Sequence, residues 1–162
     1  MQIRPAEKAD LDRIEAVYAT ARAFMRASGN MKQWVNGYPQ RALLEADIDQ
    51  GQLFVITESG TIHGVFAFIL GDDSTYAYIE DGKWPNSKPY GTIHRIGNDG
   101  AIRGAVKAAL DFALQFTDEV RADTHADNAP MQHVLTKNGF VRCGIIYLEN
   151  GDPRIAYQYS KE

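Results

Sequence analysis

The chain has 162 residues and a formal net charge of −4, with 44% apolar and 23% charged residues, a composition typical of one folded domain covering residues 1–162. The acidic balance argues against a general nucleic-acid-binding protein, because there is no basic surplus to neutralise phosphates. No apolar run reaches the length of a membrane span, and the single cysteine, Cys143, allows no internal disulfide. We therefore predict a cytoplasmic protein that binds neither nucleic acid nor membrane.

Periodicity and chain breakers predict the elements of the first half. Apolar residues recur at helical spacing behind a possible cap, Asp10, and Pro39 opens a second short helix. Two apolar strands joined by a Ser-Gly turn are typical of a hairpin. The predicted elements are a strand at 2–4, helices at 10–27 and 39–48, strands at 53–58 and 61–70, and an alternating strand at 76–80.

The second half alternates strands and helices. Asn128 and Pro130 suit the N-cap and first turn of a helix, and Gly139 suits its end. The predicted elements are a strand at 92–96, a helix at 102–116, a strand at 120–125, a helix at 128–138, and strands at 141–148 and 154–159. Apart from the short strand at 76–80, the order is βααβββαβαββ, which predicts an α/β (mixed α+β) fold, with a mixed sheet and helices.

One strand-to-helix turn has the features of an anion site. After the strand ending at Ile96, the chain turns through residues 97–100 into a helix, whose first amides have no internal partners. These amides and the helix dipole favour a phosphate, and Arg103 and Lys107 add positive charge. Many such turns bind nothing, however, so the loop alone is a weak signal.

The element order, this loop and the segment DTHADNAPMQHVLTKNGFVRCGIIY (123–147) together resemble the GNAT superfamily of acetyl-CoA-dependent N-acetyltransferases, over essentially the whole chain. The resemblance implies a mostly antiparallel sheet that splays to form a CoA groove. The family's phosphate motif, Arg/Gln-x-x-Gly-x-Gly/Ala, falls without gaps on 101–106 and keeps only Gly104. A frame shifted by two recovers Arg103 and Ala108, but it loses the central glycine and needs an insertion.

The resemblance assigns the acetyl-CoA contacts mainly to backbone amides, so the altered side chains weaken the match without removing the site. Val106 is the largest departure, because its bulk stands where the backbone should approach the ligand. Asn128 would contact the pantetheine or phosphate region. The alternative is that it only caps a helix, and both roles can hold together. The implied cofactor residues are Ile96, Ala101, Ile102, Arg103, Gly104, Ala105, Val106, Lys107, Asn128 and Met131.

Acetyl transfer needs an oxyanion donor and a base for the amine. The amide of Ile96, or its neighbour, is the expected donor. The family often supplies its acid from a tyrosine at the position of Leu135 here, so that role does not carry over. His94 and His125 are the candidates, since histidine titrates near neutrality; each could instead be a hydrogen-bonded structural histidine. Tyr147 and Cys143 are weaker candidates.

The acceptor pocket is expected between the first helix pair and the loops above the sheet. Aromatic and acidic side chains suit an amine through cation–π contact and ion pairing, although such aromatics more often anchor loops or the core. The candidates are Trp34, Tyr38, Glu80 and Tyr147. The histidines His63, His94, His125 and His133 are scattered without ligand spacing, which predicts no metal site.

The sequence therefore predicts an N-acetyltransferase that moves an acetyl group from acetyl-CoA to a primary amine of a small molecule, peptide or protein, by direct transfer in a ternary complex. A non-catalytic acyl-CoA-binding sensor or regulatory module on the same fold is the main alternative. This alternative is favoured by Leu135, which stands where the family often has its tyrosine acid, and by the phosphate loop, which keeps only one glycine of the family motif. A cofactor-free interaction domain is the third reading. The protein is expected to be a monomer or a homodimer, because the last strands are edges that can pair.

Overall fold

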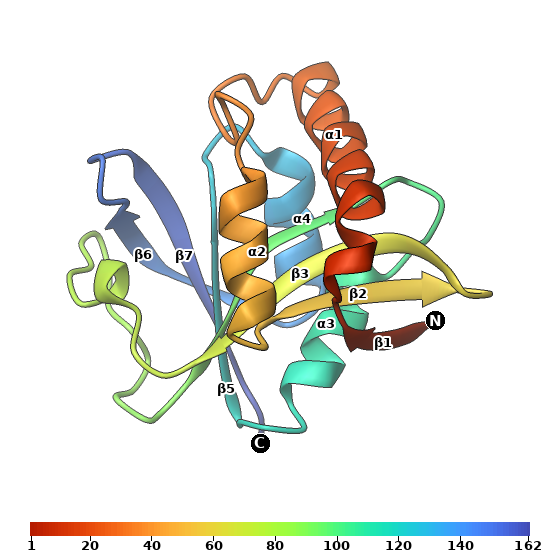
Figure 1. Ribbon diagram of the computed structural model, residues 1–162. Helices are drawn as coiled ribbons and strands as arrows, with labels where there is room; N and C mark the ends of the chain where they lie inside the picture. The colour runs from red at the N-terminus through yellow and green to blue at the C-terminus, as the bar shows by residue number, and fades with distance from the viewer.

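The computed structural model describes residues 1–162 as one seven-stranded sheet with four α-helices (Figure 1). The order of elements, βααβββαβαββ, confirms the predicted order. The bounds are β1 Gln2–Pro5, α1 Leu11–Ala27, α2 Arg41–Asp49, β2 Leu53–Glu58, β3 Thr61–Leu70, β4 Gly91–Asn98, α3 Ala105–Ala113, β5 Glu119–Thr124, α4 Ala129–Lys137, β6 Val141–Tyr147 and β7 Pro153–Ser160.

The strands follow the order β1-β2-β3-β4-β5-β7-β6 in the sheet. Every neighbouring pair is antiparallel except β4 and β5, which are parallel. This pair is joined only at its start, where Gly91 lies opposite Val120 and Thr92 lies opposite Arg121. Beyond these two positions β4 and β5 have no register, so the sheet opens between them.

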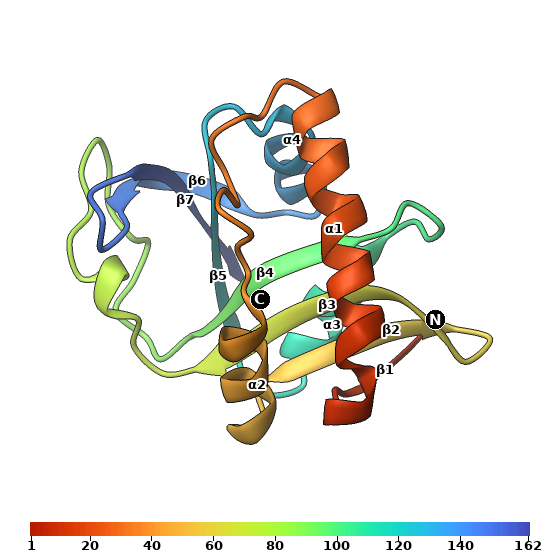
Figure 2. The same cartoon turned by 45° about the horizontal axis from the view of Figure 1, so that its top comes forward.

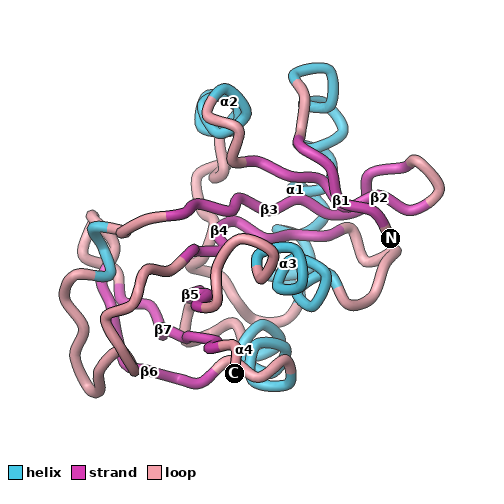
Figure 3. The backbone as a smooth tube through the Cα atoms, turned by 90° about the horizontal axis from the view of Figure 1, so that it is seen from below, coloured by secondary structure: helices cyan, strands magenta, loops and turns pink.

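The helices cover the two faces of the sheet in pairs (Figure 3). On one face, α1 and α2 pack on β2 and β3 around the fully buried Ile14, Tyr18 and Leu44. On the other face, α3 and α4 bury residues such as Ala109 and Leu135 against β3, β4 and β5. Both faces of the central strands are therefore inside the protein, and any opening between β4 and β5 lies between two helical layers.

Strand β4 carries a bulge directly beside that opening. His94 pairs with Ala67 and Gly97 pairs with Val65, so two residues of β4 stand opposite one residue of β3. Arg95, in the bulge, has φ +52°, a conformation that side-chain-bearing residues rarely adopt. The Arg95 guanidinium donates hydrogen bonds to Asp47 of α2 at 2.8 and 3.1 Å, and this buried ion pair holds the unusual backbone in place.

Two predictions of local structure are wrong. Residues 76–80 do not form a strand: Ser74–Tyr76 is a short 3₁₀ helix, and only Glu80 forms an isolated bridge, to Ile145. Helix α3 begins at Ala105 rather than at Ile102, and it ends at Ala113. The start is delayed because Gly104 takes a left-handed conformation, with φ +78°, as the N-cap residue. None of the helices has the length and apolarity needed to cross a bilayer.

Candidate active site

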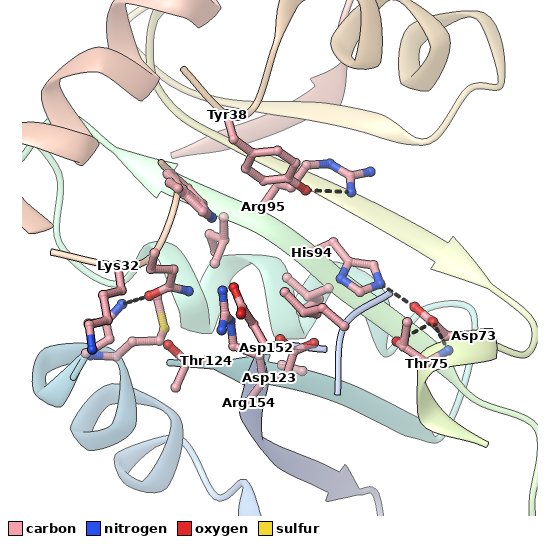
Figure 4. A pocket seen from close by; sticks show the side chains of 18 of the residues that line it. Lys32, Tyr38, Asp73, Thr75, His94, Arg95, Asp123, Thr124, Asp152 and Arg154 are labelled. Atoms are coloured by element: carbon pink, nitrogen blue, oxygen red, sulfur yellow. Dashed lines mark hydrogen bonds and ion pairs between the residues drawn. The ribbon is translucent and has the colours of Figure 1, made fainter. Parts of the chain in front are cut away.

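A cavity of about 750 Å³ occupies the opening between β4 and β5 (Figure 4). Its walls come from both strands, from the connection between α1 and α2, from the start of α4, and from the turn between β6 and β7. The volume lies in the range typical of small-molecule sites. Of the predicted site residues, the cavity is lined by Trp34, Tyr38, His94, Ile96, Val106, Asn128 and Met131.

His94 is held by a carboxylate at the cavity wall. Its Nε2 lies 2.8 Å from Oδ2 of Asp73, and both side chains are about one-fifth exposed (Figure 4). The hydrogen bond from His94 lowers the pKa of the Asp73 carboxyl below its usual range, and further bonds from Thr75 act in the same direction against the effect of burial. Nδ1 of His94 has no hydrogen-bond partner in the protein, so it remains available to accept a proton.

The bulge of β4 orients one peptide bond. The carbonyl of Arg95 accepts a 2.7 Å hydrogen bond from the hydroxyl of Tyr18, a fully buried residue of α1. Because the C=O and N–H of a trans peptide point in opposite directions, the amide of Ile96 points away from α1. The side chain of Ile96 itself lines the cavity.

The N-terminus of α3 presents free backbone donors. Its first intrahelical bond is from the amide of Ala108 to the carbonyl of Gly104, so the amides of residues 105–107 have no helical partner. The turn before it is closed by side chains: Asn98 accepts from the amide of Gly100, and Asp99 accepts from that of Ala101. Those two amides are therefore already used. The remaining amides and the helix dipole have the geometry that favours a bound anion.

The charged side chains of this loop do not converge on the helix terminus. Lys107 donates to Asp111 one turn further along α3, at 2.8 Å and on the surface. Arg103 is exposed and makes no ion pair within 4 Å. Val106 is buried in the core and also lines the cavity. The donors free at this helix terminus are thus backbone amides, and the side chain of Val106 is buried in the core.

Asn128 connects the start of α4 with the connection between α1 and α2, and these segments run side by side in Figures 1 and 2. Its Oδ1 accepts from the amide of Met131 at 3.1 Å, which confirms the predicted helix cap. Its Nδ2 donates to Oε1 of Gln33 at 3.0 Å. Arg26 in turn binds the carbonyls of Asn30, Gln33 and Trp34, so this wall of the cavity is firmly held.

The other predicted residues lie outside the cavity. His125 follows the end of β5, and its Nδ1 accepts the amide hydrogen of Asp127 at 2.9 Å. Burial, and secondarily the positive charge of Arg154, lower the pKa of His125. Glu80 and Tyr147 lie near each other, but on the surface, where the hydroxyls of Tyr147 and Tyr78 both donate to the Glu80 carboxylate. Cys143 is buried, and this raises the pKa of its thiol.

Several cavity residues were not predicted from the sequence. Asp123 accepts a 2.6 Å hydrogen bond from the hydroxyl of the buried Tyr76. Thr124 is among the residues that line the cavity, and its hydroxyl is buried without a hydrogen-bond partner in the protein. Asp152 and Arg154 enter from the turn and the start of β7. The alternating pattern of β5 and β7 predicts which face of the sheet each of these residues occupies, but the residues match no functional motif. No local sequence pattern therefore identifies them as site residues.

The donors present fit a CoA thioester better than a metal ion. Nowhere in the chain do three histidine, cysteine or acidic side chains gather closely enough to hold a metal. The free amides at the start of α3 suit a pyrophosphate, and the cavity between β4 and β5 reaches Val106 in the first turn of the same helix.

Comparison with known proteins agrees with this geometry. The family model described as "Acetyltransferase (GNAT) domain" matches residues 1–141. A crystal structure of a GNAT-family acetyltransferase from Streptococcus agalactiae is 35% identical, with a TM-score of 0.87, and covers 99% of this chain and 95% of its own. No curated protein matches significantly.

Two more distant structures share the fold alone. A ribosomal-protein-alanine N-acetyltransferase from Brucella melitensis is 17% identical with a TM-score of 0.60, and covers 99% of each chain. A GNAT-like decarboxylase in complex with isobutyryl-CoA is 15% identical with a TM-score of 0.67, again over 99% of each chain.

Proposed function

The chain belongs to the GNAT family of acetyltransferases, and from this premise we propose that it transfers an acetyl group from acetyl-CoA to a primary amine by direct transfer in a ternary complex. The observation that carries the proposal is the cavity between β4 and β5. It has the size of a small-molecule site, and its wall contains both the bulge of β4 and His94, which is hydrogen-bonded to a carboxylate. Two structures with the same fold support the proposed substrates. One is named as an alanine N-acetyltransferase, which supports an amine acceptor, and the other is a complex with isobutyryl-CoA, which supports an acyl-CoA donor.

The backbone at the start of α3 would hold the pyrophosphate. The amides of residues 105–107 and the left-handed turn at Gly104 supply the donors, and Thr124 and Asn128 line the path toward the reacting end. Main-chain donors do not depend on side-chain identity, so the loss of the usual motif residues at 101 and 106 is tolerated. This also explains why the loop carries little of the family's sequence pattern.

The bulge of β4 would position the thioester carbonyl. We assign the oxyanion donor to the amide of Ile96, whose peptide is oriented by the hydrogen bond between Tyr18 and Arg95. A donor fixed before the reaction stabilises developing negative charge without reorganisation. The amine nitrogen attacks the carbonyl carbon, the new C–N bond forms, and the C–S bond breaks to release the CoA thiolate.

His94 would take the proton from the attacking amine. Asp73 holds its Nε2 and thereby orients the ring, which leaves Nδ1 as the accepting atom. A carboxylate behind a histidine also stabilises the imidazolium that forms. His125 is less suitable, because its Nδ1 already accepts a hydrogen bond from Asp127 and the residue lies outside the cavity.

A non-catalytic acyl-CoA-binding module remains the second candidate. The observation that favours it is Leu135, a buried cavity residue at the position where the family often has a tyrosine acid. Leucine cannot donate a proton, and Val106, which belongs to the same core cluster and also lines the cavity, is apolar as well. Both readings require CoA binding, and only the first requires turnover.

Two measurements test the proposal in sequence. Calorimetric titration of the whole protein with acetyl-CoA and with CoA should give dissociation constants in the micromolar range, about −8 kcal/mol. Release of free thiol from acetyl-CoA should then depend on an added amine. Absence of binding would contradict both candidates. Binding without amine-dependent thiol release across a broad amine panel would favour the non-catalytic module.

A further inference from the structure

We propose that the amine acceptor carries a carboxylate, and that Arg154 is the residue that binds it. The inference rests on the proposed function, because it names the substrate class of the same cavity. Arg154 lies on β7 and lines the wall formed with Asp123 and Asp152 (Figure 4). The protein would thus acetylate an amino carboxylate rather than a simple amine.

The first reason is that the Arg154 guanidinium is buried without an anionic partner. The residue is only 7% exposed, yet its single hydrogen bond within the protein goes to the carbonyl of Pro153, at 2.8 Å. No carboxylate oxygen lies within 4 Å of it. An arginine offers five N–H donors in a planar fork that matches a carboxylate, so most of its donors remain unused by the chain.

The second reason comes from two other arginines whose side chains are largely enclosed by the protein. Arg95 forms an ion pair with Asp47, and Arg121 lies between the rings of Trp84 and Tyr90, at 3.7 and 3.8 Å. Arg121 also donates to Gln158. Both cations are therefore compensated by the fold itself. Arg154 also lines the cavity, but of the three it is the one with neither an ion pair nor an aromatic ring stacked on its guanidinium.

Two acidic residues lie near Arg154, but neither forms an ion pair with it. Burial lowers the pKa of Arg154, and the charges of Asp123 and Asp152 oppose this shift only in part. Asp123 is already engaged by the Tyr76 hydroxyl at 2.6 Å. A buried cation without a close counter-charge is costly, and a bound carboxylate would remove that cost.

The same cavity offers a place for the amine. His94 with Asp73 lines one part of it, and Asp123 lines another, so the acidic groups that suit an ammonium or its proton are close to the donors that suit a carboxylate. A molecule with both an amine and a carboxylate could interact with the acidic groups and with Arg154 at the same time. The volume of about 750 Å³, shared with the acyl end of the thioester, suits a small acceptor.

The test compares matched acceptors on wild-type protein and two variants. The probes are glycine, β-alanine, γ-aminobutyrate and glycylglycine, each against its carboxamide, with O-phosphoethanolamine as a phosphate probe. Calorimetric titration into the protein saturated with CoA measures binding, and thiol release from acetyl-CoA measures turnover. Arg154→Gln removes the cation. Arg142→Gln, an exposed arginine on β6, is the matched control.

We expect at least one carboxylate probe to bind better than its amide, and Arg154→Gln to reduce that preference by about 10- to 100-fold. Arg154→Lys should restore part of it, and CoA affinity and the Arg142→Gln variant should be unchanged. Equal use of acid and amide would overturn the inference while leaving the acetyltransferase proposal intact, since an amide imitates the first residue of a polypeptide. A preference for the phosphate probe, loss of CoA affinity in Arg154→Gln, or no binding of any carboxylate would also overturn it.

Discussion

The hydroxyl of Tyr18 donates a 2.7 Å hydrogen bond to the carbonyl oxygen of Arg95, and so ties helix α1 to the bulge of strand β4. The bulge turns one peptide away from the regular ladder, and the Tyr18 hydroxyl supplies the partner that the ladder no longer provides. Since Arg95 also has a strained backbone, the site depends on contacts made by two helices.

Replacing Tyr18 with phenylalanine should test this relationship. The variant loses only the hydroxyl, which we expect to lower the free energy of unfolding by about 1–3 kcal/mol, because the Arg95 carbonyl loses its donor. If the Ile96 amide is the oxyanion donor, kcat should fall by about 10-fold with CoA affinity retained. Tyr78→Phe, which removes an exposed hydroxyl bound to Glu80, is the control. Unchanged kcat in Tyr18→Phe would contradict the assignment of Ile96.

Removing one partner of the buried ion pair behind the bulge should be strongly destabilising. Asp47→Asn leaves the guanidinium of Arg95 without its charge partner at 2.8 Å, and both side chains are nearly inaccessible. We expect a loss of about 3–5 kcal/mol in urea unfolding. Asp111→Asn breaks the exposed pair with Lys107 and should cost no more than about 0.5 kcal/mol. Similar losses in the two variants would show that burial does not set the strength of the pair.

Much of the fold was predictable, because its signals are local. The helix around Ile14 follows from apolar spacing, and the cap at Asn128 follows from residue type and a proline two positions later. The alternation at 76–80 was misleading, since the segment buries Tyr76 on a 3₁₀ turn and leaves Tyr78 exposed. A pattern of alternating burial is produced by either structure, so it could not distinguish them.

The site was less predictable, because it is assembled from distant residues. Asp73 reaches His94 across 21 positions, and Asp47 reaches Arg95 across 48. Arg154 stands out only when the structure shows it buried without an ion pair, and Thr124 only when its hydroxyl is seen to be buried without a hydrogen-bond partner. No short-range sequence pattern predicts that a buried side chain will have no ion pair or hydrogen-bond partner. Residue type alone therefore selected Glu80 and Tyr147, which lie on the surface near each other and away from the cavity.

The pairing of Asp73 with His94 should appear in the pH dependence of stability. The hydrogen bond from His94 places the folded-state pKa of Asp73 below its unfolded value of about 4. The resulting stabilisation is present above that unfolded value and is lost as the pH falls through the folded pKa. Urea unfolding of wild type and Asp73→Asn should therefore differ most at neutral pH and converge as the pH falls below about 4. Parallel curves down to pH 3 would show that this carboxyl contributes no such linkage.

Substituting the two candidate histidines should separate their roles. His94→Ala removes the proposed base, and we expect kcat at saturating amine to fall by about 10²- to 10⁴-fold with CoA affinity kept. His125→Ala removes a side chain that accepts from Asp127 outside the cavity, so its kcat should be almost unchanged. The reverse result would move the base to the end of β5, and an unchanged rate in both variants would mean that the reaction uses neither.

The strongest test of the phosphate site uses two glycines with the same backbone and different surroundings. Gly104 has φ +78° at the start of α3, and Gly60 has φ +81° in the turn between β2 and β3. An added Cβ would meet nothing within 4 Å at Gly60, and at Gly104 only the end of the Met1 side chain at 3.9 Å, an ordinary contact. Valine at either position should cost about the same stability through backbone strain, roughly 1–3 kcal/mol. Only Gly104→Val alters the amides that would face the pyrophosphate. We therefore expect it alone to weaken CoA binding, by about 10-fold or more in calorimetry. Equal CoA affinity in the two variants would place the pyrophosphate away from α3.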